Sequence, residues 1–348
     1  MKKSISGRAL AALPACAAAL GLALQLCGCG KPAGPEEPVR IGLSIPTQRE
    51  ERWERDLKQL RAEAAAAGVE LLVRVSENDS ARQLAQCEEL LAGKIQVLLV
   101  APHDASAAAR IAEKAARRGV KVISYDRLIL NAPVDLYVSF DNVKVGELQA
   151  RYLAAAVPRG SYLLLSGAPT DNNAALLKRG AMRVLAPLVE SGAVRLAGDE
   201  AVYDWRPKEA RRLTEKYFAA QPAGIQAVLA PNDATAGGVI EALEALGLAG
   251  SVAVTGQDAE AAAARRIIKG TQSMTVFKDT RQLASAAFVA AMALAAGGAP
   301  LSNASIHNGK TEVPALLLVA ETVDRANLDN KLIFSGYLTR ASVYGQAR

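Results

Sequence analysis

IQVLLVAPHDA at residues 95–105 and IQAVLAPNDA at residues 225–234 nearly match each other 130 positions apart (225 − 95), and they decide the fold. Each is a short run rich in Ile, Val and Leu that ends in Pro, is followed by Asp, and leads into an Ala-rich helical pattern. A strand, a polar tip and a returning helix make the βα unit of a parallel sheet. Because both halves contain the unit, the sequence predicts two similar α/β lobes, with ligands bound beyond the carboxyl ends of the strands.

The rest of the chain repeats this alternation. About 310 residues follow the first 38, which is more than one hydrophobic core usually holds, so two domains are expected. Strands are predicted at Val39–Ile45, Glu70–Val75, Val97–Ala101, Lys121–Tyr125, Leu136–Phe140, Ser161–Ser166, Val194–Asp199, Ala227–Ala230, Ser251–Thr255, Ser273–Phe277 and Val313–Val319. Helices are predicted near 49–67, 80–92, 105–118 and 143–157, with one more long helix after about Asp279.

The first residues predict export from the cytoplasm. Three basic residues and an apolar run to Leu26 form the pattern of a signal peptide over residues 1–28. Leu26-Cys27-Gly28-Cys29 resembles the lipobox of bacterial lipoproteins, which implies lipidation of Cys29 and a linker over residues 29–38. An uncleaved transmembrane anchor is the alternative, but the apolar run is short and Pro14 interrupts it. We therefore expect a periplasmic or extracytoplasmic protein that meets the membrane only through its lipid.

Charge and cysteine content exclude several classes. The formal net charge is +6, and the three basic residues of the signal account for half of it, which leaves +3. Lys and Arg are scattered among Asp and Glu, so no nucleic-acid partner is expected. Of four cysteines only Cys87 would remain free in the folded domain, and its helical setting favours a structural role.

Polar residues gather at the predicted strand ends, and their types suit a polyol. A sugar hydroxyl donates one proton and accepts others, so Asp takes the donated proton while Arg, Lys or Asn fills the lone pairs. An aromatic ring can pack on the apolar face of a pyranose. The strand-end residues are Arg49, His103, Asp104, Asp126, Arg127, Asp141, Asn142, Asp171, Asn172, Asn173, Asp204, Trp205, Asn232, Asp233, Gln257, Asp258 and Lys278.

Seven segments in one collinear order resemble the periplasmic xylose-binding proteins of sugar ABC transporters, from about residue 38 to the C-terminal region. They are REERW (49–53), SYDRLI (124–129), SFDNVKVGELQA (139–150), GAPTDNNA (167–174), PNDATAGG (231–238), GQDA (256–259) and TQSMTVFK (271–278). These proteins share the type I periplasmic binding fold with ribose and galactose binders. The resemblance implies that fold: two doubly wound parallel-sheet lobes joined by a three-segment hinge.

The resemblance also implies a set of sugar-binding residues. Trp205 would stack on the sugar, and eight polar residues would hydrogen-bond it: Arg49, Asp126, Arg127, Asp171, Asn173, Asn232, Asp258 and Lys278. This chain departs from the family at Pro46-Thr47-Gln48, where an acidic pair often precedes the Arg, and at Tyr203-Asp204 before the Trp. The departures leave the identity of the sugar more open than sugar binding itself.

The implied mechanism is hinge closure around the sugar. The chain is expected to cross between lobes near Asn142–Gly146, near Phe277–Asp279 and once in the C-terminal region. The N-terminal lobe would comprise residues 39–142 plus about 279–312, and the C-terminal lobe residues 143–278 plus about 313–348. The expected partners are a monosaccharide, D-xylose above others, and an ABC permease, with the protein itself a monomer. The alternative is a sugar-sensing component that presents another aldopentose or a hexose to a chemoreceptor or sensor kinase.

The same residues have alternative interpretations. Asp126 and Arg127 could form a plain surface ion pair, Trp205 could fill a core, and Trp53 could pack against the other lobe or line the cleft. Catalysis is not expected, because the two histidines lack a nucleophile motif and no phosphate-binding glycine loop or metal-ligand spacing occurs. No cofactor is expected. A sugar-responsive repressor would need a DNA-reading N-terminus, where this chain has its signal.

Overall fold

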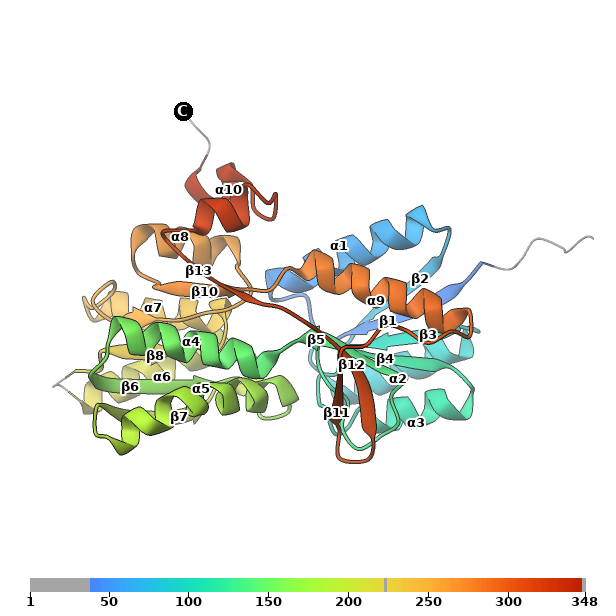
Figure 1. The fold of residues 1–348 in the computed structure, drawn as a ribbon, viewed down its shortest axis with the longest axis horizontal. Coiled ribbons are helices and arrows are strands. Elements are labelled where there is room, and N and C mark those ends of the chain that lie inside the picture. The colour runs from blue at the N-terminus through green and yellow to red at the C-terminus, as the bar shows by residue number, and fades with distance from the viewer. Residues whose placement is uncertain (1–37, 222–223, 346–348) are drawn as a thin grey trace, which may run out of the picture. The chain divides into compact units, whose positions relative to one another are not determined.

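The computed structural model describes residues 38–221 and 224–345, which belong to one compact unit that begins at Pro38. The predicted signal peptide and Cys29 lie outside the described residues. Within the unit, strands and helices alternate and build two parallel-sheet lobes (Figure 1). The predicted α/β class is therefore confirmed.

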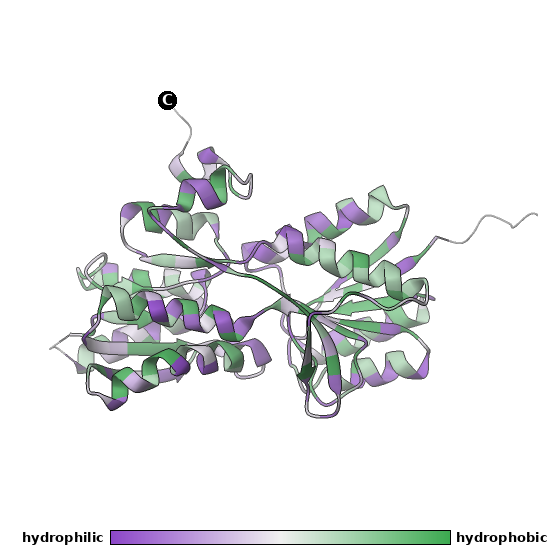
Figure 2. Ribbon diagram, viewed as in Figure 1, coloured by the Kyte–Doolittle hydropathy of each residue, from purple (hydrophilic) through white to green (hydrophobic). Residues whose placement is uncertain are grey.

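The N-terminal lobe is built on a seven-stranded sheet in the order β11-β12-β5-β4-β3-β1-β2, parallel except for β11. In chain order its strands are β1 (Arg40–Ile45), β2 (Glu70–Val75), β3 (Val97–Val100), β4 (Lys121–Tyr125), β5 (Leu136–Phe140), β11 (Ala304–His307) and β12 (Glu312–Leu318). One apolar cluster joins the sheet to α1 (Glu51–Ala66) and α9 (Thr280–Ala295). A second joins it to α2 (Ser80–Ala92) and α3 (Ala109–Arg117). Helices thus cover both faces, and the strands between them are mostly hydrophobic (Figure 2).

The C-terminal lobe has a smaller parallel sheet in the order β7-β6-β8-β9. Its strands are β6 (Gly160–Ser166), β7 (Val194–Ala201), β8 (Ala227–Leu229) and β9 (Ala253–Val254). A bridge from Gln257 to Val276 continues the sheet to β10 (Met274–Phe277), which pairs antiparallel with β13 (Glu321–Asp324). The helices of this lobe are α4 (Asn142–Ala156), α5 (Asn172–Glu190), α6 (Pro207–Ala220), α7 (Asp233–Ala245), α8 (Ala261–Lys269) and α10 (Arg340–Tyr344).

Three chain crossings join the lobes, and the third corrects a predicted boundary. The first two lie between β5 and α4 and between β10 and α9. The third was placed near residue 312, so that the strand that follows would belong to the C-terminal lobe. Instead β12 pairs in parallel with β5 of the N-terminal lobe, because its apolar residues Leu316–Leu318 complete that sheet. The crossing therefore lies between Leu318 and Glu321, and we assign the N-terminal lobe residues 39–141 and 279–318.

Two helix pairs of the C-terminal lobe approach each other through glycine. A Cβ atom on Gly146 of α4 would lie 1.9 Å from the carbonyl oxygen of Leu177 on α5, and one on Gly180 would lie 1.9 Å from that of Val143. On α7, a Cβ on Gly238 would lie 2.0 Å from the carbonyl oxygen of Pro207, at the start of α6. Only a residue without a side chain allows backbones to pack this closely.

No helix among residues 38–221 and 224–345 has the length and apolarity needed to cross a membrane. Within the same residues no three His, Cys, Asp or Glu side chains gather in a way that could hold a metal ion. Cys87 on α2 is fully buried, and burial raises its pKa to about 12, so it stays a packed thiol.

Candidate functional site

A cleft with about 350 Å³ of atom-free space, its open mouth included, lies between the ends of the strands and takes its lining from both lobes. The N-terminal lobe contributes the start of α1 and the residues after β4, and the C-terminal lobe contributes the residues after β6, β7, β8, β9 and β10. The lining residues are Glu50, Arg52, Trp53, Asp126, Arg127, Asp171, Asn173, Trp205, Asn232, Gln257, Asp258 and Lys278.

Eight of the nine predicted sugar-binding residues lie in this lining, and Arg49 does not. Helix α1 begins at Glu51, so Arg49 precedes it and lies outside the lining, with 35% of its side chain exposed. Arg52, three residues on and 5% exposed, enters the cavity instead. Glu50 was not predicted, and Gln257 was named among the strand-end residues but not in the sugar-binding set. Trp53, whose position was left open, lines the cavity.

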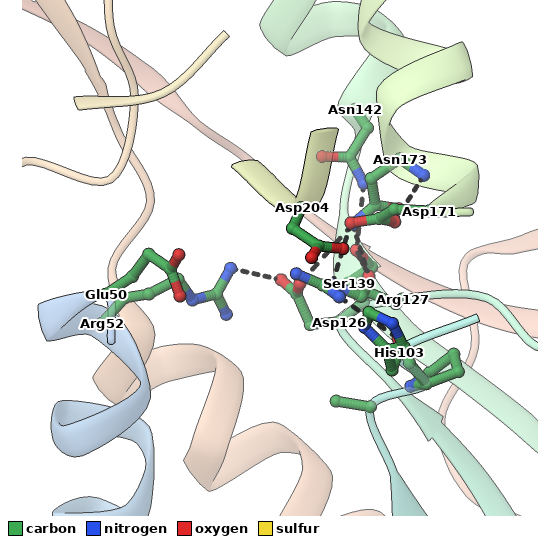
Figure 3. Close-up of polar contacts among 12 residues, drawn as sticks. Glu50, Arg52, His103, Asp126, Arg127, Ser139, Asn142, Asp171, Asn173 and Asp204 are labelled. Carbon is green, nitrogen blue, oxygen red and sulfur yellow. Dashed lines mark hydrogen bonds and ion pairs between the residues drawn. The ribbon is translucent and has the colours of Figure 1, made fainter. Parts of the chain in front are cut away.

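Three ion pairs organise the lining, and each joins an acid to a base that both touch the cavity. Arg52 Nη1 lies 2.7 Å from Asp126 Oδ1 (Figure 3). Arg127 Nε lies 2.9 Å from Asp171 Oδ2 across the lobes, and within the C-terminal lobe Lys278 Nζ lies 2.9 Å from Asp258 Oδ1. All six side chains are nearly fully buried. Pairing compensates the cost of burying each charge, which would be several kcal/mol if the charge were alone.

Arg52 is the electrostatic centre of the N-terminal side. It contacts Asp126 and, one turn along α1, Asp56, whose Oδ2 lies 3.0 Å from Nη2. Burial alone would lower the pKa of Arg52, but Asp126 and Asp56 outweigh burial and raise it well above its ordinary value. Burial opposes the charged form of Asp126 as well, yet Arg52, Lys278 and Arg127 hold its pKa below its ordinary value. Both groups therefore carry their charges at neutral pH.

The turn after β4 is held by hydrogen bonds to a single carbonyl. Asp126 has a φ of 60°, in the left-handed region that non-glycine residues rarely adopt. Its backbone oxygen accepts from Ser139 Oγ at 2.6 Å, from Tyr137 Oη at 3.1 Å and from Asn173 Nδ2 at 3.1 Å. These three bonds compensate the strained conformation and fix the direction of the carboxylate. Strain of this kind, held by its surroundings, is common at binding sites.

Both tryptophans of the chain line the cavity, one from each lobe. Trp53 is 1% exposed, and the guanidinium carbons of Arg52 and Arg127 lie 4.5 and 5.4 Å from its ring centre. Trp205 is 7% exposed, and its ring packs against Gly167, where any Cβ would lie 2.1 Å from Cη2. Two aromatic rings thus border the cavity amid charged groups, one ring from each lobe.

Two polar residues of the C-terminal lobe cap helices and also face the cavity. Asp171 Oδ1 accepts from the backbone N–H of Asn173 at the start of α5. Burial raises the pKa of Asp171, and Arg127 opposes that rise. Asn232 Oδ1 caps α7 by accepting from Thr235 N at 2.9 Å, which leaves its amide nitrogen as the part that can serve a ligand.

Several buried polar atoms around the cavity have no hydrogen-bond partner within the described residues. They are Glu50 Oε2, Trp205 Nε1, Gln257 Oε1 and Asp258 Oδ1, the last of which has only its ion-pair contact with Lys278. Leaving a buried polar group unpaired costs about 1–3 kcal/mol. A polar ligand in the cavity would supply partners to these atoms, since the set contains both acceptors and a donor.

The lobes touch each other directly around the cavity. Besides the Arg127–Asp171 pair, the backbone N–H of Ala105 donates to the carbonyl of Thr170 at 2.9 Å. Glu51 Oε2 on α1 accepts from the backbone N–H of Ala261 at the start of α8, 3.0 Å away. The structure thus has the two lobes closed on the cavity.

Two α/β lobes, three chain crossings and an enclosed polar cavity define a hinged binding protein with the type I periplasmic binding fold. The chain belongs to the periplasmic binding protein family, because the family model described as "Periplasmic binding protein domain" matches residues 41–299. The fold and the family that the sequence predicted are therefore confirmed.

Individual relatives agree with this family. The chain is 42% identical over 306 residues to the D-xylose-binding periplasmic protein of Haemophilus influenzae, covering 88% of this chain and 92% of the relative. It is 40% identical over 305 residues to the D-xylose-binding periplasmic protein of Escherichia coli, with 88% and 92% covered. A carbohydrate transporter solute binding protein from Chloroflexus aurantiacus, solved with D-glucose, superposes with a TM-score of 0.83 at 36% identity and covers 88% of this chain and 98% of its own.

Proposed function

We propose that the protein captures a monosaccharide, with D-xylose favoured, in the cavity between its lobes. The observation that carries this proposal is the lining itself: buried carboxylates, cations and amides between two tryptophans, with several polar atoms unpaired. Charge-assisted hydrogen bonds to hydroxyls and an aromatic face suit a pyranose. The names of the relatives at 40–42% identity support D-xylose.

The predicted site residues keep their proposed roles, with two changes. Arg52 takes the place that was given to Arg49, and Trp53 joins Trp205 as a stacking surface on the opposite lobe. The sugar's hydroxyls would be held by Asp126, Arg127, Asp171, Asn173, Asn232, Asp258 and Lys278 together with Arg52. In a dry cavity, loss of one matching hydroxyl strands a buried partner, and this gives selectivity among sugars.

The proposed mechanism is closure about the three crossings. Sugar binds in the open cleft, and the second lobe closes and excludes water from the ion pairs. Because the ligand contacts both lobes only when they are closed, its differential affinity sets how far the closed population rises. The closed form would then deliver the sugar to an ABC permease.

The proposed location is the periplasm, in agreement with the names of the relatives. Anchoring through a lipid on Cys29, and a monomeric state, are part of the proposal and rest on the sequence alone. A sensing role, in which the loaded protein meets a chemoreceptor or sensor kinase, is the alternative. Deleting the gene for this protein distinguishes the two, because sugar uptake falls only if the protein serves transport, whereas only the sugar response is lost if it serves sensing.

A calorimetric and thermal-shift screen against monosaccharides tests the binding proposal. Ligand that binds only the native state raises stability by RT ln(1 + [L]/Kd), so we expect D-xylose to raise the melting temperature. Asp258→Ala and Arg127→Ala should each weaken binding about tenfold or more, which is about 1.4 kcal/mol. Unchanged affinity in both variants would reject their roles. Product analysis after incubation with sugars should find no turnover, in keeping with a binding protein rather than an enzyme.

A further inference from the structure

Glu50 is a cavity residue that no part of the proposed function uses. It precedes α1, is 5% exposed and borders the cavity. Its Oε1 accepts from Arg49 Nε at 2.9 Å and from Nη2 at 2.7 Å. Its Oε2 is buried and has no hydrogen-bond partner in the described part of the chain. Arg49 therefore fixes Oε1, and Oε2 can accept a hydrogen bond from a ligand in the cavity.

Glu50 differs from the other acids of the lining in where its basic partner lies. Asp126, Asp171 and Asp258 each pair with a base that also lines the cavity. Glu50 pairs instead with Arg49, which lies outside the lining. Arg49 Nη2 also donates to the backbone oxygen of Asp204 in the C-terminal lobe. Arg49 thus links Glu50 to the opposite lobe in this closed structure.

We propose that Glu50 is a further sugar-contacting and specificity-determining residue, with Oε2 accepting one hydroxyl proton of the ligand, and that Arg49 is its positioning residue. The inference rests on the proposed function of the cavity. A carboxylate accepts hydrogen bonds and donates none, so the ligand must present an O–H group there. Sugars in which that hydroxyl is absent or methylated are discriminated against, because they leave the buried oxygen unpaired.

Calorimetry with D-xylose and its series of monodeoxy analogues tests the proposal. Glu50→Leu should weaken D-xylose binding about tenfold or more, and Glu50→Gln should weaken it less because it retains an acceptor oxygen. For the single analogue that lacks the contacted hydroxyl, wild type and Glu50→Leu should bind alike. Glu54→Gln, a change to an exposed acid in the first turn of α1, is the matched control and should bind as wild type does. Melting temperatures of all variants establish that they are folded.

The role of Arg49 is tested by a double-mutant cycle. Arg49→Met should weaken binding in the wild-type background and have no further effect in Glu50→Leu, as expected for a group that acts through Glu50. Additive losses would overturn the positioning role.

Equal losses of affinity for D-xylose and for all its deoxy analogues in Glu50→Leu would show a structural effect and would overturn the proposed contact. If Glu50→Leu binds D-xylose normally while Asp258→Ala does not, the contact is absent and the proposed function stands. If wild type binds no sugar in the panel, the proposed function itself fails.

Discussion

At the scale of single residues, Arg52 connects two buried carboxylates of the N-terminal lobe. It is buried between Asp126 and Asp56, and Asp56 Oδ1 in turn accepts from Tyr125 Oη at 2.6 Å. Burial raises the pKa of Asp56 to about 6, although Arg52 opposes the rise. One guanidinium therefore keeps two buried carboxylates charged, and it couples the core of the N-terminal lobe to the ligand cavity.

Replacing Arg52 should harm both stability and binding. In Arg52→Met, two buried carboxylates lose their cation, and we expect the free energy of unfolding to fall by about 3–5 kcal/mol. Urea denaturation measures this loss, and calorimetry should show sugar affinity lowered as well. Arg61→Met, which changes an exposed arginine of the same helix, is the control and should leave both unchanged. A stability equal to wild type for Arg52→Met would contradict the network.

Sequence reasoning located most of the lining because polar residues at the carboxyl ends of parallel strands must meet at one edge. Asp126, Asp171, Asn232 and Asp258 follow directly from that rule. The REERW segment offered two arginines, and the choice between them depended on where the helix begins, which local patterns leave uncertain by a few residues. The spacing of Arg52 and Asp56, four apart on one helical face, was the signal that could have identified the buried arginine.

At the scale of elements, close helix contacts make some glycines irreplaceable. Gly238 and Gly237 are neighbours on α7, and neither has a positive φ. A Cβ on Gly238 would meet the Pro207 carbonyl at 2.0 Å, whereas one on Gly237 would lie 3.4 Å from the end of the Arg266 side chain. The two glycines therefore have the same helical backbone conformation, but only Gly238 packs too closely against its neighbour to accept a side chain.

Alanine substitutions at these two positions should have opposite effects. Gly238→Ala forces α6 and α7 apart, and we expect it to cost about 1–3 kcal/mol of unfolding free energy. Gly237→Ala should be neutral or stabilise by up to about 1 kcal/mol, because alanine favours helix. Chemical denaturation of the pair checks both signs at once. Equal values would mean that the helices can separate without cost.

Regular βα units were predictable at this scale because strand and helix periods are local signals. The predicted strands at Glu70–Val75, Lys121–Tyr125 and Leu136–Phe140 match β2, β4 and β5 residue for residue. The C-terminal part was harder. Strands β11 and β13 are each four residues long and pair antiparallel at sheet edges, so their positions depend on distant partners rather than on their own pattern.

At the scale of the whole molecule, lobe closure brings acids together. Glu260, at the start of α8, has its pKa raised from 4.5 to about 8 by burial and by Asp233, Asp258 and Glu51, while Arg266 opposes the rise. Glu51 belongs to α1 of the N-terminal lobe and contacts Ala261 only when the lobes meet. Opening removes that neighbour, so the pKa of Glu260 is lower in the open form than in the closed form.

Sugar affinity should therefore fall as pH rises. The closed form holds the Glu260 proton more tightly, so protonation favours closure, and the advantage disappears as pH rises toward about 8. Isothermal titration of D-xylose from pH 5 to pH 9 measures this trend. In Glu260→Gln the side chain is neutral in both forms, and the decline over this range should be reduced. If the affinity of wild type and of Glu260→Gln changes with pH to the same extent, the pKa of Glu260 does not depend on closure.

The late position of β12 and α9 has a consequence for biosynthesis. Helix α9 packs against α1 although it begins 214 positions after α1 ends (280 − 66), and β12 pairs with β5 only when residues 312–318 are present. A ribosome therefore releases most of the N-terminal lobe long before the segments that finish it. We expect nascent chains that stop short of residue 280 to leave apolar side chains of α1 uncovered, and those that stop short of residue 312 to leave one edge of β5 unpaired. Such chains would depend on chaperones until these segments are made.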